Sequence, residues 1–299
     1  MISIIIPFFN EEDNLKKLYR ELTEELGKLK QEHEIIFIND GSTDKSLSMA
    51  EELKKNNDNL KIINFKKRQG KGKALDAGLK IVSGDLVCFM DADLQDDPRD
   101  LEKFIKKIGE GYDFVNGKRF LRKENPVVKF YSKLANSFLK FILKSPLSDI
   151  NCGFKLFKKN VMEDIDLYSN NFRFLPLAAY YKGFSVGEVE VNNRSRIHGK
   201  SKFGPGKLFI GMIDTLTATF IYKFAENPLH FFGIIGGFLS MLGFIILLVL
   251  GIERIFFQQL LYRRPMLFLG IVLLIVGVQI VMTGILGELI VYLNKKQKK

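Results

Sequence analysis

The chain has 299 residues, enough for one large domain and an appendage, and its hydrophobic residues, 46% of the total, are concentrated in the last quarter. The net charge of +11 and the pI near 9.4 favour an anionic partner (nucleic acid, anionic lipid or phosphate), and the apolar last quarter favours lipid. The two cysteines, Cys88 and Cys152, sit in apolar surroundings and lack metal-ligand spacing, which favours core thiols over a disulfide and predicts that the soluble domain faces a reducing cytosol.

Short β-branched runs alternate with amphipathic stretches along the first 90 residues. Residues 2–7 predict a buried strand, and this opening is too short for the apolar region of a signal peptide. Asn10 is placed to cap the next helix, whose leucines recur at spacings of three and four. Further strands are predicted at residues 34–39, 60–65 and 85–90, and helices at 46–56 and 73–82. This order predicts a doubly wound, mainly parallel α/β sheet that binds ligands at the carboxyl ends of its strands.

The most informative strand end is residues 91–95 (DADLQ), directly after an apolar strand. Asp91 and Asp93 can hold a hard divalent cation whose shell substrate phosphates complete, and that cation would stabilise charge on a departing diphosphate. A lone D-x-D is a weak signal because loops are rich in Asp, and the alternative is a helix cap before Pro98.

Two nucleotide-binding patterns are not met. The first strand is followed by residues 7–11 (PFFNE) and not by G-x-G-x-x-G, which argues against a dinucleotide oxidoreductase. Residues 70–73 (GKGK) lack Walker A spacing, so they predict a tight basic turn.

The last 70 residues predict two transmembrane helices, at about 229–251 and 266–291. Residues 229–251 and 266–287 carry no Asp, Glu, Lys or Arg, and each run is long enough to cross a hydrocarbon core of about 30 Å. Two adjacent runs of this length weaken the alternative of a soluble core helix. The lysine-rich tail predicts a cytoplasmic C-terminus, and two spans place the N-terminal domain on the same side, although arginines in the connecting loop reduce the asymmetry.

The predicted organisation has three parts. Residues 1–203 form a cytoplasmic catalytic domain, and residues 228–299 form the membrane hairpin with its basic tail. Residues 204–227 are amphipathic, and either a helix at the membrane surface or a helix packed on the catalytic domain fits them.

Five segments together resemble a known family. Residues 7–11, 39–44 (NDGSTD) and 91–95 resemble the signatures of family-2 glycosyltransferases with the GT-A fold, in the branch of dolichyl- and undecaprenyl-phosphate sugar synthases. Residues 149–155 (DINCGFK) and 196–202 (RIHGKSK) are similar to that branch's middle motif and R-x-x-G-x-S-K segment. The resemblance covers about the first 210 residues in the family's order. The terminal helix pair also resembles branch members with two membrane spans.

The resemblance implies an inverting, metal-dependent transfer of a hexose from a nucleotide-sugar to a polyprenyl phosphate, and it implies roles for matching positions. Nucleotide-sugar binding would fall to Pro7, Asn10, Glu11, Asp40 and Asp91. Mg²⁺ or Mn²⁺ and the donor diphosphate would lie among Asp91, Asp93 and Gln95. Arg119 would contact the acceptor phosphate, and Arg196 and Lys202 would close over the phosphates.

A phosphate acceptor agrees with these residue types. Its second pKa is about 6, so it is already a nucleophile and needs charge neutralisation and positioning in place of a base. Many relatives carry an acid after the middle motif, whereas residues 171–176 (NFRFLP) carry none, so no base is assigned.

Three other functions fit the sequence less well. A processive polysaccharide synthase would be expected to carry a Q-x-x-R-W segment, and this chain has no Trp. A silent membrane anchor does not explain the strand-end acids, and a nucleic-acid binder does not explain the apolar spans. The sugar, the nucleotide, the lipid length and association into a homo-oligomer stay open.

Overall fold

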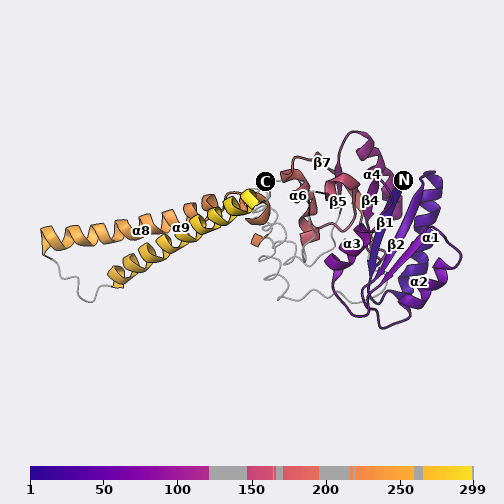
Figure 1. The fold of residues 1–299 in the computed structure, drawn as a ribbon, viewed down its shortest axis with the longest axis horizontal. Helices are drawn as coiled ribbons and strands as arrows, with labels where there is room; N and C mark the ends of the chain where they lie inside the picture. The colour runs from indigo at the N-terminus through magenta and orange to yellow at the C-terminus, as the bar shows by residue number, and fades with distance from the viewer. Residues whose placement is uncertain are drawn as a thin grey trace. The chain divides into compact units, whose positions relative to one another are not determined.

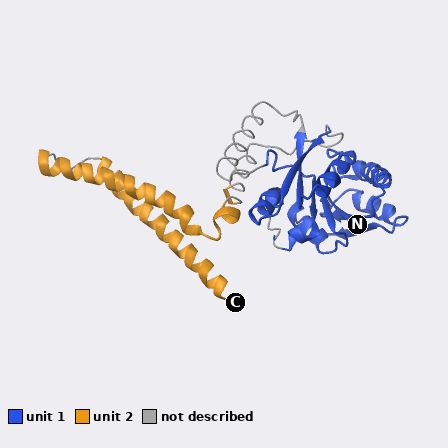
Figure 2. Ribbon diagram, turned by 90° about the horizontal axis from the view of Figure 1, so that it is seen from above, with its two compact units in different colours: residues 1–215 blue, residues 216–299 orange. Residues whose placement is uncertain are grey.

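The computed structural model describes residues 1–120, 147–163, 165, 171–194, 216–217, 220–258 and 265–297. The chain divides into two compact units, Met1–Thr215 and Leu216–Lys299 (Figure 2). Residues 196–202 and most of the predicted interfacial stretch lie outside the described residues, so the predictions made for them, and the domain boundaries at 203 and 227, stay predictions.

The first unit begins with the predicted alternation of strands and helices (Figure 1). Its described strands are β1 (Ile2–Phe8), β2 (His33–Asn39), β3 (Leu60–Asn64), β4 (Leu86–Phe89), β5 (Phe114–Phe120), β6 (Lys155–Lys158) and β7 (Val186–Asn192). Its described helices are α1 (Glu12–Lys28), α2 (Ser46–Lys54), α3 (Lys71–Leu79), α4 (Leu101–Gly109) and α6 (Leu175–Tyr181), with short 3₁₀ segments η1 (Pro98–Asp100), η2 (Lys159–Met162) and η3 (Asn171–Phe174). The predicted strands and helices are confirmed, with ends shifted by a few residues.

The described strands form one sheet in the order β3-β2-β1-β4-β6-β5-β7. Among these pairings only β6 runs antiparallel to its neighbours, β4 and β5. The others are parallel, which confirms the mainly parallel sheet. The strand order reverses between β1 and β4, and this reversal point is where open α/β sheets bind ligands.

The alternation of side chains along β1 explains how the sheet is covered. Ile2, Ile4 and Ile6 point to one face and belong to the core cluster that includes the leucines of α1. Ile5 points to the other face, where α3 packs so closely that a Cβ at Gly78 would lie 2.7 Å from the Ile5 Cγ2. Both cysteines are buried and free, which confirms the prediction of core thiols.

Two local predictions are wrong. Asn10 does not cap α1, because Glu11 holds the N-cap position and makes no side-chain capping bond. Residues 70–73 are not a tight turn, because α3 already begins at Lys71 and includes Gly72 and Lys73. Gly70, at φ 96°, supplies the change of direction before the helix.

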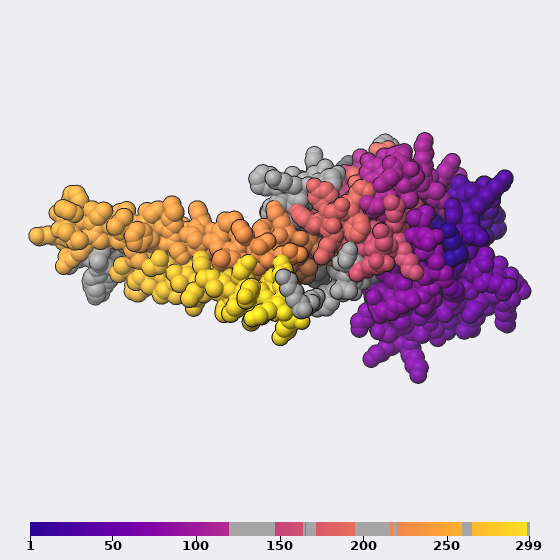
Figure 3. All heavy atoms as spheres, turned by 45° about the horizontal axis from the view of Figure 1, so that its top comes forward, coloured from indigo at the N-terminus to yellow at the C-terminus, as the bar shows by residue number. Residues whose placement is uncertain are grey.

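The second unit contains a π-helical turn, η4 (Phe220–Phe224), and two long helices, α8 (Pro228–Phe257) and α9 (Pro265–Gln297). By length and composition both long helices can cross a membrane, and only 17% and 11% of their most apolar windows are buried. A soluble core helix would be mostly buried, so the two predicted apolar helices are confirmed as candidate spans. Figures 1 and 3 show them side by side.

Candidate active site

The loops after β1 and β2 are joined by hydrogen bonds that involve the predicted Asn10. This residue has φ 56°, and its Oδ1 accepts a hydrogen bond of 2.8 Å from the backbone N–H of Thr43. Its own N–H donates to the Ser42 Oγ over 3.0 Å, and the N–H of Glu11 donates to the Ser46 Oγ over 2.8 Å. Hydrogen bonds therefore hold residues 7–11 and residues 39–44 together at the carboxyl edge of the sheet.

Asp40 lies at the end of β2 and is 5% exposed. Its Oδ1 accepts hydrogen bonds from the N–H groups of Gln69 (2.7 Å) and Gly70 (3.0 Å). A Cβ at Gly41 would lie 2.5 Å from the Arg68 nitrogen, so the loop before α3 packs directly over Asp40. This carboxylate thus orders that loop, and its binding of a nucleotide stays a prediction.

The same loop brings Arg68, which the sequence did not single out, to the end of β1. Its guanidinium carbon lies 4.3 Å from the centre of the Phe9 ring, and its Nε lies 3.8 Å from the Asp40 Oδ2. An arginine stacked on an aromatic ring beside a carboxylate offers planar surfaces suited to a nucleobase. The aromatic residue at position 9 was the only sequence signal of this pair.

Asp91 and Asp93 follow β4 at the reversal point of the sheet. Asp91 is paired with the ammonium of Lys71, in the first turn of α3. Burial acts to raise the pKa of Asp91, but the Lys71 ammonium, with Arg119 and Lys155, outweighs it and lowers this pKa. The Asp91 carboxylate is therefore ionised and already attracts a cation.

The loop from Asp91 to Gln95 has the ligand chemistry of a Mg²⁺ or Mn²⁺ site. Two carboxylates and an amide oxygen are hard ligands, and Mg²⁺ is commonly held by one or two carboxylates plus substrate phosphates. Among the described residues no three Asp, Glu, His or Cys side chains gather around one point. Leu94, between Asp93 and Gln95, has φ 61°, so packing holds this loop in a strained shape.

The next two acids, Asp96 and Asp97, stabilise the loop at residues 91–95 and the segment that follows it. Asp96 Oδ2 accepts the N–H of Asp91 over 3.2 Å, and burial, with the charges of Asp91 and Asp93, raises the pKa of Asp96 to about 7. Asp97 caps η1 by accepting the N–H of Arg99. The helix cap before Pro98 is therefore Asp97, which removes that alternative for Asp91 and Asp93.

The predicted middle motif lies against Asp91. A Cβ at Gly153 would be 2.6 Å from the Asp91 Oδ2, so only glycine permits this approach. Arg119, at the end of β5, donates to both oxygens of Asp149 at distances of 2.8 and 3.0 Å. The buried Lys155 donates to the Asn116 Oδ1 and the Ile150 carbonyl, and burial lowers its pKa to about 8. The motif thus contributes positive charge beside the predicted metal ligands.

After β7 the chain runs beside the loop at residues 91–95. The N–H of Arg194 donates to the Gln95 carbonyl over 3.0 Å, and its guanidinium bridges Glu21 and Asp97. Arg196 and Lys202 lie outside the described part of the chain. Phe172 of η3 lies 5.1 Å from the Lys71 ammonium, so the segment in which many relatives carry an acid borders the site here with an aromatic ring.

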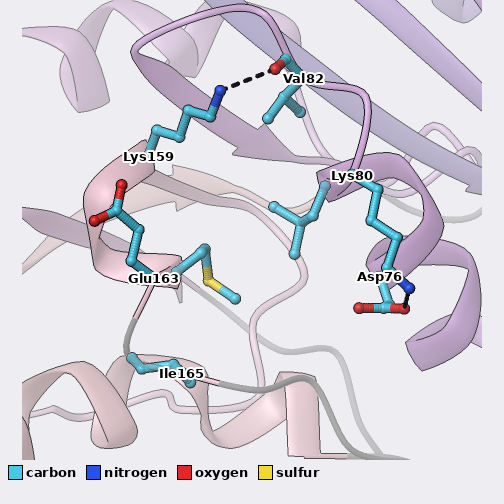
Figure 4. A pocket seen from close by; sticks show the side chains of 8 residues that line it. Asp76, Lys80, Val82, Lys159, Glu163 and Ile165 are labelled. Carbon is cyan, nitrogen blue, oxygen red and sulfur yellow. Dashed lines mark hydrogen bonds and ion pairs between the residues drawn. The ribbon is translucent and has the colours of Figure 1, made fainter.

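A separate cavity of about 260 Å³ opens where α3 ends (Figure 4). Its lining includes an Asp76–Lys80 ion pair and Lys159, which donates to the Val82 carbonyl. The N–H of Lys159 also bonds to the Asp85 carbonyl at the start of β4, so this cavity lies at the opposite end of β4 from Asp91.

Comparison with known proteins shows which family the chain resembles over most of its length. The family model described as Glycosyl transferase family 2 matches residues 3–166. The dodecaprenyl-phosphate galacturonate synthase of Rhizobium johnstonii is 32% identical over 97% of this chain and 87% of its own length. The undecaprenyl-phosphate 4-deoxy-4-formamido-L-arabinose transferase of Proteus mirabilis is 30% identical over 97% of this chain and 88% of its own.

Solved structures show the same fold. Glucosyl-3-phosphoglycerate synthase from Mycobacterium tuberculosis, in complex with Mn²⁺, UDP-glucose and phosphoglyceric acid, superposes with a TM-score of 0.58 at 19% identity, over 73% of this chain and 79% of that one. A second structure of this synthase gives a TM-score of 0.56 at 18% identity, over 74% of this chain and 80% of that one. The GT-A fold is confirmed, and with the sequence match over more than half its length the chain belongs to glycosyl transferase family 2.

Proposed function

We propose that this glycosyltransferase moves a sugar from a nucleotide-sugar to a polyprenyl phosphate, giving a lipid-phosphate-linked sugar. The observation that carries the proposal is that the similarity to two polyprenyl-phosphate sugar transferases extends over 97% of the chain, including both apolar helices. The relatives' names differ in their sugar, so the proposal names none.

The site geometry supports a phosphate acceptor. Arg119 places positive charge beside Asp91, and it is held in one orientation by Asp149. A largely dianionic phosphate can attack without a base, so cations that position and neutralise it are what the reaction requires. Attack by a phosphate oxygen as the nucleoside diphosphate departs would invert the anomeric carbon.

The donor end of the site is proposed to lie at the reversal point of the sheet. Asp91, Asp93 and Gln95 would hold Mg²⁺ or Mn²⁺, which when bound neutralises charge on the leaving diphosphate. Pro7, Glu11 and Asp40 would lie beside the nucleotide. Arg196 and Lys202 would close over the phosphates.

The experiment that tests the function is a transfer assay with mass spectrometry of the lipids. Purified protein in detergent is incubated with Mn²⁺, undecaprenyl phosphate and, in turn, UDP-glucose, UDP-galacturonate and GDP-mannose. A lipid-phosphate sugar is expected with one donor, reduced at least 100-fold by Asp93→Ala and unchanged by Asp58→Ala, which alters an exposed acid. Donor-dependent polymer, or no turnover with these and further donors, would refute the proposal.

The orientation in the membrane is also proposed. Lys295, Lys296, Lys298 and Lys299 follow the second apolar run, so the C-terminus and the catalytic unit would face the cytoplasm, where they would meet nucleotide-sugars. A C-terminal fusion to a reporter that is active only outside the cytoplasm should be silent, and an active fusion would reverse the orientation. Association into a homo-oligomer stays a prediction.

A further inference from the structure

Lys71 contacts two parts of the candidate site, although the sequence assigned it no role. Its ammonium pairs with Asp91 and lies 5.1 Å from the centre of the Phe172 ring. The side chains of Lys71 and Asp91 are 30% and 37% exposed. Both can therefore change partners without unfolding the protein around them.

The backbone holds Lys71 in this position. Gly70, immediately before it, donates its N–H to both oxygens of Asp40 at 3.0 Å, and α3 begins at Lys71. Gly72 is buried, whereas Lys73 is exposed. Of the two lysines in this first turn, Lys71 is therefore the one held between the loop over Asp40 and the loop at residues 91–95.

The ammonium of Lys71 is paired with the Asp91 carboxylate, to which a divalent cation would also bind. Lys71 pairs with the Oδ1 of Asp91, and an ammonium and a divalent cation repel each other strongly at short distance, so both cannot lie against this oxygen at once. A cation that binds there must displace Lys71, and the displaced ammonium then needs a new anionic partner. A diphosphate arriving with the cation supplies acceptor oxygens at that place.

We propose that Lys71 is the counter-ion of Asp91 before the donor binds and a ligand of the donor diphosphate afterwards. The diphosphate half rests on the proposed function, since it takes the donor to be a nucleoside-diphosphate sugar. The flexible stem of lysine and its three N–H donors suit this exchange, and the Phe172 face lies within cation–π distance of the ammonium. As a result the divalent cation and the nucleoside diphosphate bind cooperatively, and each binds weakly alone.

The first test measures Mn²⁺ binding to the full-length protein without nucleotide, by the electron paramagnetic resonance signal of free Mn²⁺. Lys71→Met is expected to bind Mn²⁺ about tenfold or more tightly than the wild type, because the competing ammonium is gone. Lys73→Met, a matched change on the exposed neighbour, should leave the affinity unchanged, and Asp91→Asn should abolish binding. Equal or weaker binding by Lys71→Met and by Lys71→Gln, in variants with wild-type unfolding temperatures, overturns the proposal.

The second test repeats the titration with saturating UDP and with saturating GDP. The nucleotide that binds should tighten Mn²⁺ binding to the wild type, and this gain should fall at least tenfold in Lys71→Met. If the nucleotide increases the Mn²⁺ affinity of Lys71→Met as much as that of the wild type, Lys71 is not a ligand of the diphosphate. If neither nucleotide tightens Mn²⁺ binding to the wild type, the proposed donor class fails with the diphosphate half, while the Mn²⁺ titration still decides whether Lys71 is the counter-ion of Asp91.

Discussion

Neighbouring cations on one strand have different surroundings, as Arg119 and Lys118 of β5 show. Arg119 and its partner Asp149 are 17% and 14% exposed and share two hydrogen bonds. Lys118 and Glu190 are 42% and 60% exposed and lie 3.5 Å apart. Removing one partner of a buried pair leaves a charge without compensation, whereas an exposed pair contributes little to the free energy of unfolding.

Replacing Asp149 by Asn should therefore lower the free energy of unfolding by about 2 kcal/mol, less than for a fully buried pair because water reaches both side chains. The transfer rate should fall at least tenfold, since Arg119 loses the partner that fixes its orientation. Urea unfolding and the lipid transfer assay measure both effects. Glu190→Gln is the control, with an expected change below about 0.5 kcal/mol. Equal losses in the two variants would contradict the assignment of Arg119 as a held, site-facing cation.

At the scale of elements, Asp113 joins the ends of three strands. It precedes β5, accepts a hydrogen bond of 2.8 Å from Lys158 of β6, and bonds to both the N–H and the hydroxyl of Ser185 before β7. The hydrogen bond from Lys158, with those from Ser185 and against the opposing effect of burial, lowers the pKa of Asp113 to about 2. The ionised carboxylate therefore stabilises this half of the sheet.

Acid should remove that stabilisation over a defined range. The folded-state pKa of Asp113 lies below its unfolded value, so its contribution is complete above about pH 4 and is lost as the pH falls towards 2. Allowing for partial exposure, the wild type should lose about 1–2 kcal/mol relative to Asp113→Asn over this range. Urea unfolding at pH 6, 4 and 3 measures the difference. Asp85→Asn, which alters a 93% exposed carboxylate, should follow the wild type. A constant difference between wild type and Asp113→Asn would show that the carboxylate is not paired.

At the scale of the whole molecule, the second unit depends on close contact between α8 and α9. Glycines recur every seven residues on the contacting faces, at 236 and 243 on α8 and at 270, 277 and 284 on α9. A Cβ at Gly277 would lie 2.5 Å from the Ser240 backbone nitrogen, whereas a Cβ at Gly251 would meet nothing within 4 Å. Small residues let helix backbones approach each other in a membrane, where packing replaces the hydrophobic effect.

Gly277→Leu should therefore separate the two helices and reduce the yield of membrane-inserted protein several-fold, whereas Gly251→Leu should not. Membrane fractionation and unfolding by SDS compare the two variants. Mn²⁺ binding per folded molecule should be the same in both, because the predicted metal ligands belong to the first unit. Equal insertion of both variants would show that the hairpin does not need this contact.

Several features followed from the sequence because local patterns determine them. Alternating β-branched runs and amphipathic stretches predicted the order of the first strands and helices, and uncharged runs predicted the apolar helices. The D-x-D was expected to follow a strand at the carboxyl edge of the sheet, and it does follow β4, since parallel strands end at one edge of a sheet. The binding of a metal and a nucleotide by these acids stays a prediction.

Tertiary structure alone decided which side chains meet across the sheet. Asn10 was expected to cap its own helix, but a loop 33 residues away supplies its partner, Thr43. The pairs Lys71–Asp91 and Arg119–Asp149 join residues 20 and 30 positions apart, a distance at which sequence spacing carries no information about contact. The sequence does not show why residue 153 is a glycine, whereas the structure does, because Asp91 lies against it. Local backbone preference fixes which elements form, whereas packing of the completed sheet fixes which charges become neighbours.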